Sequence, residues 1–149
     1  MQTTPRCPDF VAEQGRANEY RRAKAILNHG KHPTFIGRSL YATCARNGGV
    51  CFFRVGSTDA AVAMIGMRTN CLLVLCVEPH FRRLGLGAAA LAYLQCSFAR
   101  VVESAVPWFE RQGFISIGEM KQGKSLKTQV MVLSSLRELA GRVSRLLTP

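Results

Sequence analysis

The sequence predicts an α/β domain: a mixed, mostly antiparallel sheet of about six to seven strands, flanked by helices. Short β-rich runs separated by turn signals follow one another between Ser39 and Val77. The apolar run Leu72–Val77 leads through a glycine turn into an Ala/Leu-rich helical segment. Amphipathic helical patterns stand near both ends of the chain and would cover the sheet. One domain is expected for 149 residues, with its core over residues 39–133.

The N-terminal region is predicted to be helical. Residues 1–8 contain two prolines and are expected to be poorly ordered. Asp9 is a suitable N-cap, so a helix is expected over residues 9–28. Gly15 is a weak point of that helix, because glycine disfavours a helix interior.

The next segment is predicted to form an antiparallel meander. Its strands are expected at Leu40–Ala45, Val50–Val55, Ala61–Met67 and Leu72–Val77. Asn47-Gly48-Gly49 favours a hairpin turn, and Gly56-Ser57-Thr58-Asp59 favours a second one.

The remaining elements alternate between helix and strand. They are expected as a helix over 87–98, a strand over 99–102, a short helix between Pro107 and Gly113, strands over 115–117 and 128–133, and a helix over 135–147. The last helix begins with the capping box Ser135-x-x-Glu138. Its apolar stripe would dock on the body of the domain, and contact with a second copy in a homodimer is the alternative.

The central stretch has the features of an anion-binding turn. A strand ends at Val77, Pro79 restricts the residue before it, and Arg82–Arg83 lead into Gly85-x-Gly87 at the start of a helix. Such a junction presents free backbone N–H groups and the positive end of a helix dipole. The two glycines would let a ligand's phosphates approach the backbone, so the stretch predicts a pyrophosphate site.

These residues resemble the acyl-CoA signature of the GCN5-related N-acetyltransferase (GNAT) family, Arg/Gln-x-x-Gly-x-Gly/Ala. The signature stands here as Arg82-Arg83-Leu84-Gly85-Leu86-Gly87, preceded by the usual Val-x-Pro as Val77-Glu78-Pro79. A second stretch resembles the family's later helix, Ala-x-x-Leu/Phe-Tyr-x-x-x-Gly-Phe. Its matching residues are Ala105, Trp108, Phe109, Gly113 and Phe114.

The same glycines also satisfy a dinucleotide fingerprint. Gly85-x-Gly87-x-x-Ala90 matches it, and Glu103 stands near the spacing of the ribose-binding acid. In dinucleotide folds, however, the first glycine follows the strand almost at once. Here seven residues separate Val77 from Gly85, which favours the acyl-CoA interpretation.

The resemblance implies transfer of an acyl group from acetyl-CoA, or another acyl-CoA, to an amine by direct attack, with no metal. A backbone N–H of the central strand would polarise the thioester carbonyl. The residues expected to contact the co-substrate are Leu75, Cys76, Val77, Arg82, Arg83, Leu84, Gly85, Leu86, Gly87, Ala88 and Phe109.

The catalytic groups depart from the family pattern. Phe109 occupies the position that often holds a tyrosine acid, and Val102 stands where an asparagine is expected. Glu78, at the end of the central strand, is the candidate base, although a solvated carboxylate explains it as well. Ser104 is a candidate to relay a proton to the departing thiolate.

The charge of the chain points to anionic partners. Lys and Arg number 20 against 9 Asp and Glu, a formal net charge of +11. Part of this excess would serve CoA, and the rest would face DNA, RNA, an acidic protein or solvent. No run approaches the length of a membrane span and no signal-peptide core is present, so a cytoplasmic protein without membrane contact is expected.

The cysteines and histidines do not predict a metal site. Six cysteines contain no Cys-x-x-Cys pair, and most have apolar neighbours, so reduced, buried thiols are expected. His29 and His32 lie in a polar linker and are interpreted as loop residues. Together these observations predict an acyl-CoA-dependent N-acyltransferase. A non-catalytic module that binds acyl-CoA or nucleic acid is the alternative.

Overall fold

The structure is a computed structural model, and it describes residues 7–29, 36–66, 70–123 and 127–134. Its core is a seven-stranded sheet with the order β1-β2-β3-β4-β5-β7-β6. The strands are β1 (Val11–Gln14), β2 (Val50–Val55), β3 (Thr58–Gly66), β4 (Cys71–Val77), β5 (Phe98–Val102), β6 (Phe114–Gln122) and β7 (Lys127–Leu133). All neighbouring strands pair antiparallel except β4 and β5, so the predicted mixed sheet is confirmed.

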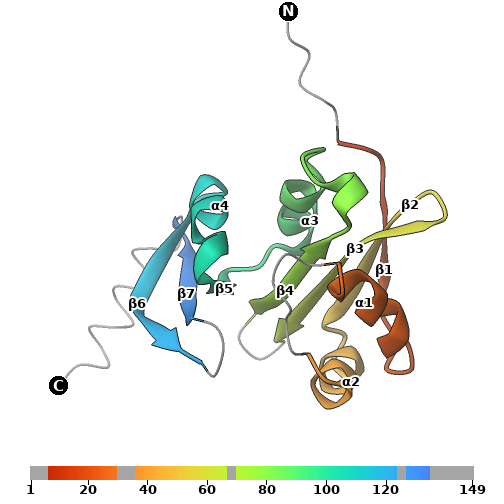
Figure 1. The fold of residues 1–149 in the computed structure, drawn as a ribbon, viewed down its shortest axis with the longest axis horizontal. Coiled ribbons are helices and arrows are strands. Elements are labelled where there is room, and N and C mark those ends of the chain that lie inside the picture. The colour runs from red at the N-terminus through yellow and green to blue at the C-terminus, as the bar shows by residue number, and fades with distance from the viewer. Residues whose placement is uncertain (1–6, 30–35, 67–69, 124–126, 135–149) are drawn as a thin grey trace, which may run out of the picture.

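Helices cover both faces of this sheet (Figure 1). They are α1 (Tyr20–Leu27), α2 (Arg38–Arg46), α3 (Leu86–Leu94) and α4 (Val106–Arg111), with 3-10 turns at Pro79–Phe81 and Glu103–Ala105. One apolar cluster joins the sheet to α3 and α4, and a second joins the opposite face to α1 and α2. Residues that alternate along β3 and β4 divide between the two clusters, as the period of a strand requires.

The predicted helix over 9–28 is wrong in its first half. Residues Val11–Gln14 form the edge strand β1, paired antiparallel with β2, and α1 begins only at Tyr20. Gly15 follows the strand and donates its amide to the Val50 carbonyl at 2.8 Å. A Cβ at Gly15 would overlap the side chains of Val50 and Phe52, so close approach of two chain segments requires glycine there.

The predicted strand Leu40–Ala45 is also wrong, because α2 covers it. Tyr41, Cys44 and Ala45 are its buried residues, and their spacing of three and four places them on one helical face. Asn47-Gly48-Gly49 therefore joins a helix to β2 and is not a hairpin turn. The meander exists nevertheless, with β1 as its first strand.

The other elements match their predictions with shifted ends. Gly56 and Ser57 form the β2–β3 turn, since Val55 pairs with Thr58. Strand β6 extends to Gln122, beyond the expected 115–117, and contains a bulge after Ile117. The buried Gln129 side chain donates to the Ile117 carbonyl at 2.8 Å and to that of Gly118 at 3.2 Å, which satisfies the bulged backbone. The predicted helix over 135–147, with its proposed dimer contact, lies outside the described residues.

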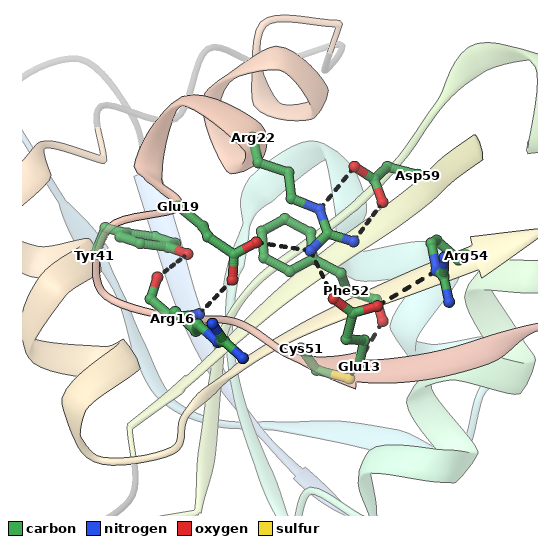
Figure 2. Close-up of polar contacts among 9 residues, drawn as sticks. All are labelled: Glu13, Arg16, Glu19, Arg22, Tyr41, Cys51, Phe52, Arg54 and Asp59. Carbon is green, nitrogen blue, oxygen red and sulfur yellow. Dashed lines mark hydrogen bonds and ion pairs between the residues drawn. The ribbon is translucent and has the colours of Figure 1, made fainter. Parts of the chain in front are cut away.

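One guanidinium joins the N-terminal elements to the sheet (Figure 2). Arg22 on α1 donates to Asp59 on β3 at 2.7 and 2.8 Å, and to Glu13 and Glu19 at 3.0 and 2.9 Å. Its guanidinium carbon lies 4.1 Å from the centroid of the Phe52 ring. The hydrogen bonds to Asp59 raise the pKa of Arg22 above its ordinary value, so the network keeps its central cation at every physiological pH.

The Glu19 carboxylate should make stability depend on pH. Its pKa is lowered, first by the hydrogen bond from the Arg16 amide at 2.9 Å and further by Arg22. A carboxylate with a lowered folded-state pKa adds stability above its unfolded pKa, and that contribution is lost as the pH falls through the folded value.

We therefore expect Glu19→Gln to reduce the free energy of unfolding by about 1 kcal/mol at neutral pH. The gap to the wild type should close at acid pH, once Glu19 is protonated in both the folded and the unfolded state. Urea titrations in steps from neutral to about pH 3 measure the gap. A gap that stays constant over this range would contradict the assignment.

Candidate functional site

The two parallel strands of the sheet separate after their first residues. β4 pairs with β5 only through Cys71 with Phe98 and Leu72 with Ala99, although both strands continue. The pairing of β4 with β3 shifts by one at the same place, which makes Leu73 a bulge residue. We call this separation the β4–β5 fork. In Figure 1, β1–β4 lie on one side of it and β5–β7 on the other.

On the fork side, the second half of β4 pairs with no strand among the described residues. The Glu78 amide donates to the Ala60 carbonyl at 2.8 Å, so Glu78 faces β3. Because N–H and C=O directions alternate along a strand, Cys76 also faces β3, whereas Leu75 and Val77 face the fork. The Val77 carbonyl accepts a hydrogen bond from Arg82 Nε at 3.0 Å. The amide and carbonyl of Leu75 are thus directed to where β5 has diverged.

The glycine turn lies between the end of β4 and α3. Gly85 is the N-cap of α3, and its φ of +81° is a left-handed conformation that favours glycine. A Cβ there would be in ordinary van der Waals contact with Cys7 Cβ at 3.8 Å. Within the described residues, no backbone carbonyl accepts a well-formed hydrogen bond from the amides of residues 83–88. A turn with unsatisfied amides at a helix N-terminus fits a pyrophosphate.

The second glycine has a packing role. A Cβ at Gly87 would lie 3.3 Å from the Trp108 ring and 3.7 Å from Val77. Trp108, on α4, therefore contacts the first turn of α3 from across the β4–β5 fork. In the sequence Trp108 is recognisable only as part of a motif, and no local pattern indicates that it contacts the other half of the sheet.

The two arginines of the signature differ. The Arg82 guanidinium is bound within the protein: Nε donates to Val77, and one terminal nitrogen donates to the His29 carbonyl at 2.6 Å. Arg83 is exposed, has a φ of +65°, and pairs with no carboxylate among the described residues. Of the pair, Arg83 is the cation available to a bound phosphate, whereas Arg82 holds the turn against β4.

Glu78 has a partner that the sequence did not indicate. Both of its carboxylate oxygens lie 2.9 Å from His29 Nδ1. His29 follows the C-cap of α1, as expected for a loop residue, but its contact with a carboxylate 49 residues away in sequence was not predicted. The Glu78 side chain is 16% exposed and that of His29 is 58% exposed. The pair thus has one mostly buried and one accessible member.

Ser104 and Phe109 follow β5 on the other side of the fork. Ser104 is exposed and lies in the 3-10 turn that follows β5. Because β4 and β5 are parallel, Ser104 and Glu78 both follow the carboxyl-terminal ends of their strands. Phe109 is only 8% exposed and packs edge-on against Trp108 and Phe114. Phe109, which was expected to contact the co-substrate, therefore lies in the core on the α3–α4 face.

The cysteines of the described region are free thiols. Burial raises the pKa of the Cys76 thiol, which lies 3.5 Å from the Ile26 carbonyl and packs with the cluster under α1. A neutral, packed thiol does not act as a nucleophile. In the described part of the chain, no three His, Cys, Asp or Glu side chains converge as metal ligands, and no helix has the length and apolar character of a membrane span.

Neither the protein-family models nor the curated proteins contain a match to this chain. Solved structures do match its fold. The ribosomal-protein-S18-alanine N-acetyltransferase of Escherichia coli is 18% identical, with a TM-score of 0.64 over 84% of this chain and 93% of that chain. Arabidopsis thaliana Naa50, in complex with the bisubstrate analogue CoA-Ac-MVNAL, is 16% identical, with a TM-score of 0.64 over 82% and 96%. A GNAT-family acetyltransferase of Bacillus cereus is 15% identical, with a TM-score of 0.63 over 83% and 95%.

Proposed function

We propose that this chain, which has the fold of the GCN5-related N-acetyltransferases, transfers an acetyl group from acetyl-CoA to a primary amine. The observation that carries the proposal is the β4–β5 fork beside the glycine turn. The fork exposes the backbone of β4, and the turn has amides that donate to no backbone carbonyl of the described residues. A long, thin ligand with a diphosphate at one end and an amide-containing arm at the other fits both ends.

The residues of the turn would bind the diphosphate of CoA. The amides of residues 83–88 donate to its oxygens, and the N-terminus of α3 adds a favourable dipole. The exposed Arg83 adds a positive charge. Leu75 and Val77 supply the contacts in the fork through their backbone, whereas Cys76 contributes through packing alone.

The Leu75 amide is the donor that would stabilise negative charge on the thioester oxygen. It faces the fork two residues after the bulge residue Leu73, and it belongs to a strand that pairs with β3. A preorganised backbone donor of this kind accounts for about 10²–10³ in rate in other acyl transfers. Acyl-CoA supplies an activated thioester, so the protein needs no covalent intermediate.

The acceptor is an amine on, or associated with, an anionic molecule. The formal net charge of +11 supports DNA, RNA, a ribosomal component or an acidic protein as that molecule. The Escherichia coli neighbour acts on a protein alanine, and the analogue bound to the Arabidopsis neighbour carries a peptide. Peptide N-termini therefore belong with nucleic acids among the acceptors to be tested.

A mixed acyl-CoA pool, incubated with tRNA, DNA, basic and acidic peptides, and spermidine, tests donor and acceptor together. Mass spectrometry should find one acceptor that gains an acetyl mass, with an equal amount of CoA thiol released. The slope of log affinity against log salt then decides whether nucleic acid is the partner, and a slope near zero excludes it.

A non-catalytic acyl-CoA module is the second candidate, and Phe109 supports it. The buried phenyl ring has no hydroxyl to protonate a departing thiolate. Tight CoA binding without any acyl adduct or thiol release would establish the module and exclude the enzyme.

A further inference from the structure

The geometry points to His29 as the base that deprotonates the acceptor amine, with Glu78 as the residue that positions it. This inference rests on the proposed function and names a group that the signature motifs do not contain. His29 Nδ1 lies 2.9 Å from both oxygens of Glu78, and the Glu78 carboxylate is mostly buried. A carboxylate held against Nδ1 selects the tautomer in which Nε2 carries the lone pair.

The pair is held at the end of the strand that lines the β4–β5 fork. The Glu78 amide is bonded to Ala60, and its carbonyl accepts from the Phe81 amide at 2.9 Å. The His29 amide donates to the Ile26 carbonyl at 3.1 Å, and the His29 carbonyl accepts from Arg82 at 2.6 Å. Both backbones are thus fixed independently of the side-chain contact between them.

The surroundings of His29 supply one negative and one positive group. Among the described residues, the Glu78 carboxylate contacts its ring and the Arg82 guanidinium contacts its carbonyl. The nearby Cys76 thiol has its pKa raised by burial and is neutral. The ring itself is 58% exposed, so its outer nitrogen can exchange protons with a substrate and with water.

Acyl transfer requires the acceptor nitrogen to lose two protons. A primary alkylamine is mostly an ammonium ion at neutral pH, and its nitrogen cannot attack until it loses a proton. His29 Nε2 takes this proton, and the resulting imidazolium is stabilised by Glu78. The nitrogen then bonds to the thioester carbon while the carbon–sulfur bond breaks. The second proton of the nitrogen goes to the leaving thiolate, and His29 returns its proton to solvent.

The test uses His29→Asn, because the asparagine amide keeps an N–H donor toward Glu78 but has no Nε2. The probes are n-butylamine, which is an ammonium ion at pH 7, and hydroxylamine, which is mostly neutral there. We expect kcat/KM for n-butylamine to fall about 100-fold at pH 7 and that for hydroxylamine to fall less than about 3-fold. Glu78→Gln should lower the n-butylamine rate about 10-fold.

The pH dependence of kcat/KM distinguishes a general base from a residue with a purely structural role. As the pH is lowered, the wild-type kcat/KM for n-butylamine should fall more steeply than that of the variant, because the variant should follow only the ionisation of the amine. His80→Asn is the matched control, since His80 is exposed on the neighbouring 3-10 turn, and it should behave as the wild type.

Equal losses with both probes would overturn the inference and indicate a structural role. Unchanged rates in His29→Asn would overturn it as well. A wild type that binds CoA but acylates neither probe nor any acceptor of the screen would overturn the proposed function itself, so the two failures are distinguishable.

Discussion

Gly85→Glu is expected to weaken CoA binding by at least about 100-fold. The new carboxylate would stand where we propose that the diphosphate binds, repel it, and compete for the amides of the α3 N-terminus. The left-handed φ of +81° adds a backbone cost of about 1–2 kcal/mol, which lowers stability but leaves the rest of the fold in place. Isothermal titration calorimetry with CoA measures the loss.

Gly56→Glu is the matched control. Gly56 also has a positive φ, +62°, and open space at its Cβ, but it lies in the β2–β3 turn. The variant carries the same charge and a similar backbone strain, so its CoA affinity should stay within about 2-fold of the wild type. If both variants bind CoA equally well, the glycine turn is not the diphosphate site and the proposed function fails.

Arg22→Met is expected to lower the free energy of unfolding by about 2–3 kcal/mol. The substitution removes the cation from Glu13, Glu19 and Asp59 and leaves three carboxylates close together (Figure 2). Methionine keeps an apolar contact with Phe52, so the loss measures the charge network rather than packing. Chemical denaturation with urea at neutral pH provides the measurement.

Arg54→Met is the comparison for this effect. The Arg54 side chain is 39% exposed, and within the described part of the chain it forms one ion pair, to Glu13 at 3.4 Å. An exposed single pair contributes about 0–1 kcal/mol, so this variant should be only slightly destabilised. Equal losses in the two variants would show that the network of Arg22 adds nothing beyond an ordinary surface ion pair.

The errors of the sequence-based prediction have a common physical cause. Val11–Gln14 was assigned to a helix and Leu40–Ala45 to a strand, and both segments are short enough for tertiary contacts to override local preference. Position 15 requires glycine because the side chains of Val50 and Phe52 approach its backbone too closely for a Cβ. Neither residue is near Gly15 in sequence. The same holds for His29 and Glu78, whose contact spans 49 positions.

The sequence by itself determined the strand, the glycine turn and the helix that follows it, because these features depend on the conformations of neighbouring residues. It also determined the order of elements from β2 to β7, with shifted ends, of which the extension of β6 to Gln122 is the largest. Only the tertiary structure decided that β4 and β5 diverge, that Arg82 binds the protein while Arg83 faces outward, and that His29 meets Glu78. Those outcomes depend on which distant segments pack together, and local residue patterns do not contain that information.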